Sequence, residues 1–371
     1  MSAPILHIAP HLWSGAGSVI TRLCEHQQRR RPVAIATTGG GAPAGDWPAY
    51  RTRLRRAGVR HVTLDTFQRA PEVYWDSAAR LAAMFDTLRP AVVHAHAGVP
   101  TALAVIARTL SGVRPRVIGQ MYSWGVGRPA WMDRHDAWAF AQADVAVCSA
   151  HAYHRALRAL GVPAARLVYL PWGLPLDTLP WRGGGPPPVD ASSPVIGFVG
   201  RLEPRKGQLE LVEAFARVRR TWPHARLELV GPVADRAYAA AVRDAIRVRG
   251  VRDAVRLRGR VSDVPAILRT WDLFVSLSAD EGQGLAVLEA MAIGVPVAAR
   301  IVRGIEDFLL DGGTGWAIPG RSPAATAAAM CRVLDDAAGS RTVARRARRM
   351  VERRYDWTRM MAAFERLYRD A

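Results

Sequence analysis

The chain has 371 residues, about half of them hydrophobic, which is too many for one ordinary core and suits two domains of roughly 150–200 residues each. Its three cysteines are far apart and form no Cys-x-x-Cys pair, which disfavours a disulfide framework and a zinc ribbon. The first residues lack the pattern of a secretory signal, and no stretch reaches the roughly 18 apolar residues of a membrane span. We therefore expect a cytoplasmic protein.

The formal net charge of +19 raises the question of an anionic partner, because a strongly basic surface attracts polyanions and membranes. Most arginines are spread along the chain, and the real clusters are residues 29–31, 51–60 and 341–354. On helices such clusters are most often solvated faces. We expect no nucleic-acid partner. Peripheral contact with the inner face of a membrane, or with an anionic or membrane-borne acceptor, is the alternative.

The first half of the chain alternates short apolar strands with helical stretches. It opens with a strand over residues 5–9, a glycine-containing turn over residues 13–18 and an amphipathic helix through Val19 and Leu23. Further strands are predicted at residues 33–36, 61–64, 91–94, 116–118, 145–148 and 167–170. Continuous apolar strands separated by helices are typical of a parallel sheet that helices cover on both faces.

A polar stretch rich in proline and glycine, residues 179–194, interrupts this pattern and is predicted to be a linker. A second alternating series follows, with strands at residues 195–199, 226–230, 255–257, 273–276 and 296–299. We therefore expect an N-terminal domain over residues 1–178, a C-terminal domain over residues 195–350 and a last helix over residues 351–371. Two doubly wound α/β domains leave a cleft at the carboxyl ends of their strands, where ligands of such folds bind.

One basic position differs from all the others. Of the 51 lysine and arginine residues only Lys206 is a lysine, and it lies in the sequence GRLEPRKG, residues 200–207, directly after an apolar run. Arginine is a bulky planar fork, whereas lysine is a compact point charge, so a site that places one ammonium against a phosphate oxygen cannot always accept the exchange. The alternative is that the lysine survived by chance on a solvated turn.

A second dense motif occupies residues 278–297, with the sequence SADEGQGLAVLEAMAIGVPV. A strand is predicted to end near Leu277, and a glycine-spaced loop then carries Glu281. A helix is predicted from about Leu285 to Ile293, where Gly294 ends it.

The start of this predicted helix is a candidate anion site. The free amide groups of Gly284, Leu285 and Ala286 point outward and share the positive end of the helix dipole. Glu289 lies too deep for a phosphate, but its carboxylate could accept hydrogen bonds from paired hydroxyls, as on a ribose. Alone, this pattern is more often a capping loop with two solvated glutamates. Beside the Lys206 motif we favour the site.

In combination these motifs resemble the retaining glycosyltransferases of family 4, which have the GT-B fold. The resemblance depends on GRL with Lys206-Gly207, EGxG with Glu289-Ala-Met-Ala, GxPV at 294–297 and DGxTG at 311–315. It is strong over residues 195–319 and looser in the first half, at Gly15–Gly17 and residues 93–96. The resemblance implies a hexosyltransferase that uses a nucleotide sugar, with UDP favoured, and needs no further cofactor.

Chemistry and resemblance together suggest roles for the donor residues. Arg201 and Lys206 would clamp the diphosphate, Glu281 would lie near the hydroxyls of the donor sugar, and Glu289 would bind the ribose. The remaining donor-binding candidates are Gly15, Ala16, Gly17, Gly200, Gly282, Gln283, Gly284, Leu285 and Ala286. No Asp-x-Asp sequence occurs, so we expect no divalent metal, with the cations and the helix start in its place.

Acceptor-side candidates come from the first half. The pair His94 and His96 follows a predicted strand, and we expect at least one of them at the mouth of the cleft, with His96 favoured near the sugar. Tyr122 and Trp124 could stack on an acceptor, although core packing is the more usual role of such aromatic side chains. The resemblance suggests no protein nucleophile, but attack by the acceptor from the same face as the leaving group.

The sequence departs from the family pattern at two places. Residues 170–175 lack the family's Asn-Gly pair, and Gln283 stands where an aromatic is common, so the identity of the donor sugar stays open.

Rival functions come from other classes of protein. A nicotinamide dehydrogenase would need a third glycine after Gly17 and an acid near residue 37, and both are missing. A sugar phosphorylase or a nucleotide-sugar hydrolase stays open, and a non-enzymatic polyanion-binding protein is the weaker alternative. The acceptor, the linkage and the oligomeric state are open too.

Overall fold

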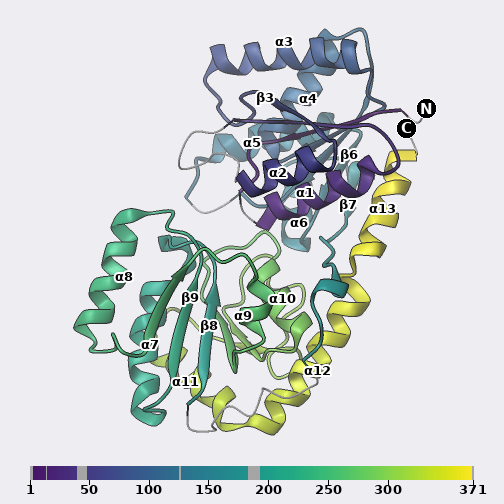
Figure 1. Ribbon diagram of the computed structural model, residues 1–371. Helices are drawn as coiled ribbons and strands as arrows, with labels where there is room; N and C mark the ends of the chain where they lie inside the picture. The colour runs from purple at the N-terminus through teal and green to yellow at the C-terminus, as the bar shows by residue number, and fades with distance from the viewer. Residues whose placement is uncertain (1–2, 14, 40–47, 125–126, 183–192, 370–371) are drawn as a thin grey trace. The chain divides into compact units, whose positions relative to one another are not determined.

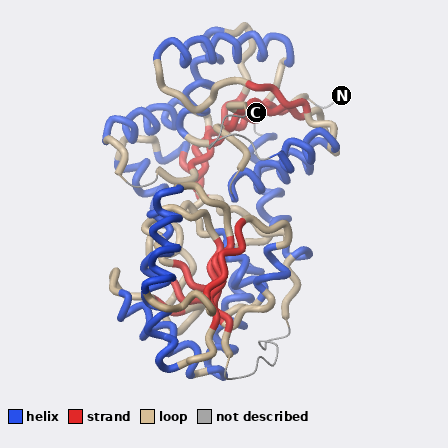
Figure 2. The backbone as a smooth tube through the Cα atoms, turned by 60° about the vertical axis from the view of Figure 1, so that its left-hand side comes forward, coloured by secondary structure: helices blue, strands red, loops and turns tan. Residues whose placement is uncertain are grey.

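The computed structural model describes residues 3–13, 15–39, 48–124, 127–182 and 193–369. It divides into two compact units, Met1–Trp172 together with Arg359–Ala371, and Gly173–Thr358. In each unit a parallel sheet lies between helices on either side (Figures 1 and 2). The predicted class, two doubly wound α/β domains, is confirmed.

The first unit contains a seven-stranded parallel sheet in the order β3-β2-β1-β4-β5-β6-β7. Its strands are β1 Ile5–Ala9, β2 Val33–Thr37, β3 Arg60–Thr63, β4 Val92–His96, β5 Arg116–Met121, β6 Val145–Cys148 and β7 Leu167–Tyr169. All residues of β1, β2 and β4 are buried, as expected of central strands covered on both faces. The order reverses direction between β1 and β4.

Seven α-helices accompany this sheet among the residues that the structure describes. They are α1 Gly15–Gln28, α2 Pro48–Arg56, α3 Pro71–Leu88, α4 Gly98–Leu110, α5 Ala130–Gln142, α6 His151–Ala159 and, from the end of the chain, α13 Trp357–Arg369. Leu6 and Ile8 of β1 pack in a core with residues of α3 and α4. His7, between them in the sequence, points to the opposite face, because successive side chains of a strand alternate.

The second unit contains a six-stranded parallel sheet in the order β10-β9-β8-β11-β12-β13. The strands are β8 Val195–Val199, β9 Arg226–Val230, β10 Val255–Gly259, β11 Leu273–Ser276, β12 Val297–Ala299 and β13 Trp316–Ala317. The helices are α7 Gln208–Thr221, α8 Arg236–Val248, α9 Val264–Leu268, α10 Leu285–Ile293, α11 Pro323–Asp335 and α12 Ala337–Arg354. Five strands were predicted. The sixth, β13, is two residues long and leaves no periodic signal.

Central strand β11 shows how the sheet of the second unit is covered. Leu273 and Val275 lie in a core with α7, α8 and α11, whereas Phe274 lies in a core with α10 and α12. Apolar residues on both faces of one strand therefore require helices on both sides.

The described part of the predicted linker packs on the second unit. The Arg182 amide donates to the carbonyl of Ile293 at 3.1 Å, and a Cβ at Gly294 would come within 2.1 Å of the Trp181 ring. Residues 183–192 lie outside the described residues. The compact units also divide the chain at 172/173, rather than at the predicted end of the first domain at 178.

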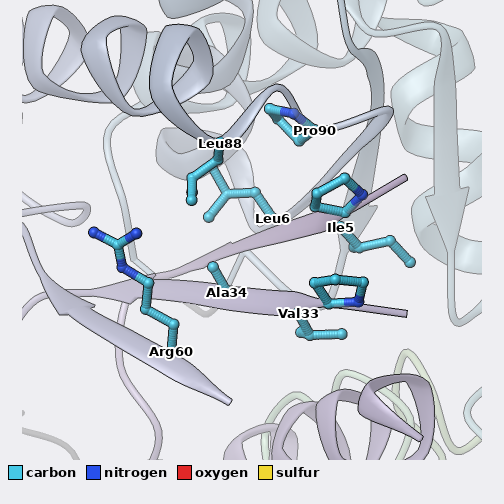
Figure 3. A pocket seen from close by; sticks show the side chains of 9 residues that line it. Ile5, Leu6, Val33, Ala34, Arg60, Leu88 and Pro90 are labelled. Atoms are coloured by element: carbon cyan, nitrogen blue, oxygen red, sulfur yellow. The ribbon is translucent and has the colours of Figure 1, made fainter. Parts of the chain in front are cut away.

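A small apolar cavity of about 110 Å³ lies at the amino-terminal edge of the first sheet (Figure 3). Leu6, Ala34 and Leu88 line it, with Arg60 beside them, and Pro4, Pro32 and Pro90 precede the nearby strands. The amino ends of β1 and β2 form this edge, so the cavity is remote from the carboxyl edge where ligands of doubly wound sheets bind.

Candidate functional site

The candidate donor site lies where the strand order of the second sheet reverses. Strands β8 and β11 are neighbours there, and their carboxyl ends lead into two loops. We call residues 200–207 the cation loop and residues 278–284 the glutamate loop. Open parallel sheets bind ligands outside the carboxyl ends of their strands at such a reversal. The fold therefore brings the two motifs of the sequence together.

Lys206 and Glu281 form an ion pair, with Nζ 2.5 Å from Oε1. Both side chains are mostly buried, with 12% and 16% of their areas exposed. Burial alone would raise the pKa of Glu281, but the charge and hydrogen bond of Lys206, helped by Ser278 and Arg205, outweigh it and lower the pKa. Glu281 is therefore a carboxylate at neutral pH.

The cation loop contains two further cations. The Arg201 guanidinium donates from Nη2 to Glu203 Oε1 at 2.9 Å, and Arg205 Nη2 donates to the same oxygen at 3.0 Å. Burial lowers the pKa of Arg201, although a guanidinium stays charged in any case. Arg201, Arg205 and Lys206 thus place positive charge at the carboxyl end of β8.

Helix α10 begins at Leu285, as predicted, and its start is open to an anion. Gly284 precedes it with a φ of 70°, and no side chain caps the helix. The amides of Val287 and Leu288 both donate to the Gly284 carbonyl, whereas those of Leu285 and Ala286 have no acceptor among the described residues. Two free amides at the positive end of a helix suit a phosphate oxygen.

The other predicted residues of this motif surround the helix start. Gly282 precedes it, Gln283 is 5% exposed, and Glu289 lies in the second turn, partly exposed. A Cβ at Gly284 would meet Ile305 Cδ1 at 2.3 Å, so glycine is needed both for its positive φ and for space.

The carboxyl end of α10 is held by two arginines that sequence reasoning missed. Arg348 donates to the Ala292 carbonyl at 2.5 Å, and Arg182 donates from Nε to the Gly294 carbonyl at 3.2 Å. Cations at this end complement the helix dipole. Only the high arginine content hinted at them, because neither residue belongs to a motif.

Sequence reasoning also missed the connections between the loops. Arg205 Nη1 donates to the Asp280 carbonyl at 2.8 Å, and Arg303 Nε donates to the Asp280 carboxylate at 2.9 Å. Asp280 itself is 1% exposed. The burial of Asp280, which makes cationic partners necessary, is seen only in the structure, so the sequence offered no signal for these connections.

The acceptor-side histidines lie in a buried cluster of the first unit. His7 of β1 is the register partner of His94 of β4, and the rings of His94 and His96 are 4.3 Å apart. None of the three has exposed area. Burial lowers the pKa of His7 to about 4 and the pKa values of His94 and His96 well below the usual range, so all three are neutral near pH 7.

One chain of hydrogen bonds fixes the proton on each ring nitrogen of His7 and His96. His7 Nε2 donates to Gln27 Oε1 at 2.7 Å, because an amide oxygen only accepts. His7 Nδ1 is therefore an acceptor, and His96 Nε2 donates to it at 2.9 Å. His96 Nδ1 in turn accepts from the Tyr122 hydroxyl at 2.7 Å. The expectation of an open histidine at a cleft mouth is wrong for this structure, since burial encloses both rings.

The chain continues from Gln27 into the last helix. Gln27 Nε2 donates to the Tyr368 hydroxyl at 3.0 Å, and Tyr368 donates to His94 Nδ1 at 2.8 Å. Helix α13 therefore completes the polar interior of the first unit.

The three imidazoles have nitrogens within 4.8 Å of one another, a spacing that a metal ion could use. A tetrahedral zinc ion with bonds of about 2.0–2.1 Å would hold two ligand nitrogens about 3.3 Å apart. His7 Nδ1 and His96 Nε2 are closer, at 2.9 Å, with the geometry of an N–H···N hydrogen bond. We therefore assign the cluster to hydrogen bonding.

The other candidates of the first unit have mixed placements. Tyr122 stacks on Trp172 at 5.3 Å, whereas Trp124 packs edge-on against Tyr153 at 6.2 Å beside a hydrophobic core. Trp124 thus has the core packing that was named as the more usual role.

Gly15, Ala16 and Gly17 form the first turn of α1, rather than the predicted loop. A Cβ at Gly17 would come within 2.8 Å of the Leu12 backbone, so close packing explains this glycine.

Among the described residues, no helix combines the length and the apolar character that crossing a membrane requires.

Two family models match the chain in adjoining parts. The model "Glycosyltransferase Family 4" matches residues 13–178, and the model "Glycosyl transferases group 1" matches residues 193–336. Among curated proteins, the glycogen synthase of Mycobacterium tuberculosis is 29% identical over 76% of this chain and 69% of its own length. The D-inositol 3-phosphate glycosyltransferase of Salinispora tropica is 30% identical over 48% of this chain and 38% of its own length.

Solved structures share the fold over the whole chain. HepE from Anabaena superposes with a TM-score of 0.83 at 18% identity, covering all of both chains. Sucrose-phosphate synthase from Thermosynechococcus elongatus gives a TM-score of 0.82 at 20% identity, covering 100% of this chain and 99% of its own. The family models, the relatives and the fold agree that the chain is an enzyme of the family 4, group 1 glycosyltransferases, with the GT-B fold.

Proposed function

We propose that this glycosyltransferase moves a hexosyl group, with retention of configuration, from a UDP-sugar to a hydroxyl of its acceptor. The observation that carries the proposal is the Lys206–Glu281 pair, at 2.5 Å, beside the free amides of Leu285 and Ala286. A cation and a helix start suit a diphosphate, and an ionised carboxylate suits sugar hydroxyls. The HepE structures contain UDP, UDP with glucose, or UDP-glucose, which supports the choice of nucleotide.

In the proposed reaction, the bond from the anomeric carbon to the β-phosphate oxygen breaks and the leaving diphosphate gains negative charge. Arg201, Lys206 and the amides at the start of α10 neutralise that charge without rearranging. The acceptor oxygen bonds to the anomeric carbon on the same face, and its proton passes to the departing phosphate oxygen. Glu281 holds the sugar and Glu289 the ribose. Because the sequence has no Asp-x-Asp pair, we assign charge neutralisation to these groups rather than to a metal.

We place the acceptor at the carboxyl edge of the first sheet. Tyr122 follows β5 at that edge, its ring is stacked on Trp172, and its hydroxyl is held by His96. His96 then acts through Tyr122, since both of its nitrogens are bonded inside the first unit. The acceptor itself is unassigned, with an anionic or membrane-borne molecule as one candidate class, and we expect the reaction in the cytoplasm.

Calorimetry with UDP, GDP and ADP in a chelating buffer tests the donor site. We expect UDP to bind with no added metal, and failure of all three at millimolar concentration would show that the site is assigned wrongly.

A labelled UDP-sugar pool, incubated with cell extract and with Glu281→Ala as the blank, tests the reaction. A labelled glycoside supports transfer. Release of free sugar alone would indicate a hydrolase, and phosphate-dependent formation of a sugar phosphate would indicate a phosphorylase.

A further inference from the structure

Arg205, which has no role in the proposed reaction, joins the cation loop to the glutamate loop. Its carbonyl accepts the Ala279 amide at 2.8 Å, and its Nη1 donates to the Asp280 carbonyl at 2.8 Å. The next residue, Lys206, pairs with Glu281. Two consecutive residues of one loop thus contact three consecutive residues of the other, which fixes the register between the loops.

Glu203 holds the other side of the Arg205 guanidinium. Arg205 Nη2 donates to Glu203 Oε1 at 3.0 Å while Nη1 bonds the Asp280 carbonyl. The side chain is 26% exposed, so the fork is largely enclosed between its two partners. Arginine can make both bonds at once with its rigid fork, whereas a lysine ammonium is a point charge and would make at most one of them well.

Asp280 is held from a second direction as well. Its carboxylate accepts from Arg303 Nε at 2.9 Å, while its carbonyl accepts from Arg205. A Cβ at Gly304 would come within 2.6 Å of the Glu281 carbonyl, so the backbone after Asp280 is closely packed as well. Little freedom is left to the residue that follows Asp280.

We propose that Arg205 is a positioning residue that fixes Glu281 relative to Lys206 and so sets the contact of Glu281 with the donor sugar. Arg205 itself does not touch the donor. The inference rests on the proposed function, because it takes Glu281 as the sugar ligand. The positive charge of Arg205 acts in the same direction, since it helps to keep Glu281 ionised.

Calorimetry on the 371-residue chain tests this role without an acceptor. The titrated ligands are UDP, UDP-glucose, UDP-galactose and UDP-N-acetylglucosamine. The UDP-sugar whose affinity differs most from that of UDP is chosen for the variants. We expect Arg205→Ala to weaken binding of that UDP-sugar about tenfold, and binding of UDP by less than about threefold. In a Glu281→Ala background, Arg205→Ala should change neither affinity further, because its effect passes through Glu281.

Three variants separate positioning from charge and from fold. Arg205→Lys keeps the charge but loses the fork, and should resemble Arg205→Ala. Glu203→Gln keeps an acceptor oxygen and should retain most of the sugar-dependent affinity. Arg219→Ala is the matched control, because Arg219 also bonds a carbonyl, that of Pro223 at 2.8 Å, and a carboxylate, that of Asp253 at 3.1 Å, with 25% of its side chain exposed.

Several outcomes would overturn the inference. One is an equal loss of UDP and UDP-sugar affinity in Arg205→Ala and Arg205→Lys, and another is additivity with Glu281→Ala. If the wild-type chain binds all three UDP-sugars with the affinity that it has for UDP, Glu281 is not a ligand of the sugar, and the inference is wrong. Absence of any UDP binding would instead defeat the proposed function. If Arg205→Ala fails to fold, Arg205→Lys and Glu203→Gln decide the question.

Discussion

Lys206 and Glu281 lie 75 residues apart in the chain and form an ion pair of 2.5 Å across the reversal of strand order in the second sheet. Each side chain neutralises the charge of the other. Because both are mostly buried, either charge without its partner would lower the stability of the fold. A donor that binds there must supply both a negative group for the lysine and hydroxyls for the glutamate, which is what a sugar diphosphate offers.

Lys206→Arg tests whether the chain's single lysine is needed for its shape. We expect turnover of the UDP-sugar to fall at least about tenfold with the thermal melting temperature unchanged, because a planar fork cannot place one compact ammonium at the same point. Initial rates and melting curves of the two proteins measure this. Arg219→Lys is the control, and an unaltered rate in Lys206→Arg would mean that the lysine is incidental.

The buried histidines predict a loss of stability in acid. The pKa of His7 is about 4 in the folded chain and near 6.5 when exposed, so between these values the unfolded state binds more protons. Stability is therefore fully present above about pH 6.5 and falls as the pH drops towards 4, by about 1.4 kcal/mol per pH unit for each such histidine. Urea denaturation at pH 7, 6 and 5 measures the slope.

The variant for this prediction is His7→Gln, in which the slope should become shallower because one buried imidazole is gone. His224→Gln, at an exposed position of the second unit, is the control and should keep the wild-type slope. Equal slopes in all three proteins would contradict the neutral cluster.

Gly98→Ala should destabilise the first unit. Gly98 begins α4, and a Cβ there would lie 2.0 Å from the Asp136 carboxyl carbon. This carboxylate is buried and cannot easily move, because it forms ion pairs with Arg69 at 3.1 Å and with Arg128 at 2.8 Å. Overpacking of this kind costs about 1–3 kcal/mol. Thermal denaturation compares this variant with Gly112→Ala, where the nearest atom is 3.7 Å away. Equal melting temperatures would disprove the contact.

Tyr122→Phe tests the acceptor side. The variant keeps the ring that stacks on Trp172 but removes the hydroxyl bonded to His96. We expect transfer to the acceptor in cell extract to fall about tenfold or more, with UDP affinity unchanged, because Arg201, Lys206 and Glu289, which we assign to UDP, belong to the second unit. Labelled product and calorimetry measure the two effects, with Tyr74→Phe as the control. Lost UDP binding with intact acceptor preference would show that the acceptor side is misplaced.

The local elements of the donor site could be predicted from the sequence. Strands β8 and β11 and helix α10 have the predicted bounds, because each strand is a continuous apolar run and Gly294 stops the helix with a φ of 94°. The positions of Glu203, Arg205 and Asp280 could not be predicted, since their bonds depend on how two distant loops meet. Gly17 misled the prediction because its packing against Leu12, not a loop, explains the glycine.

The histidines show a different limit. The sequence places His94 and His96 on one face of a strand, but His94 bonds the hydroxyl of Tyr368, which lies 274 residues further along the chain. The sequence around β4 does not indicate a partner so far along the chain. A pair of histidines at the end of a strand is therefore easily interpreted as part of an exposed ligand site.

The same distance bears on how the protein is made. Gln27 and His94 are translated before the second unit, yet the hydroxyl that bonds both of them belongs to Tyr368, which follows that unit in the chain. Domains usually fold in order of synthesis. In this protein, the side chains of Gln27 and His94 in the first unit lack their bonds to Tyr368 until the whole second unit has been translated. Nascent chains cut short before Tyr368 should therefore expose this interior to proteases and chaperones even when the second unit is complete.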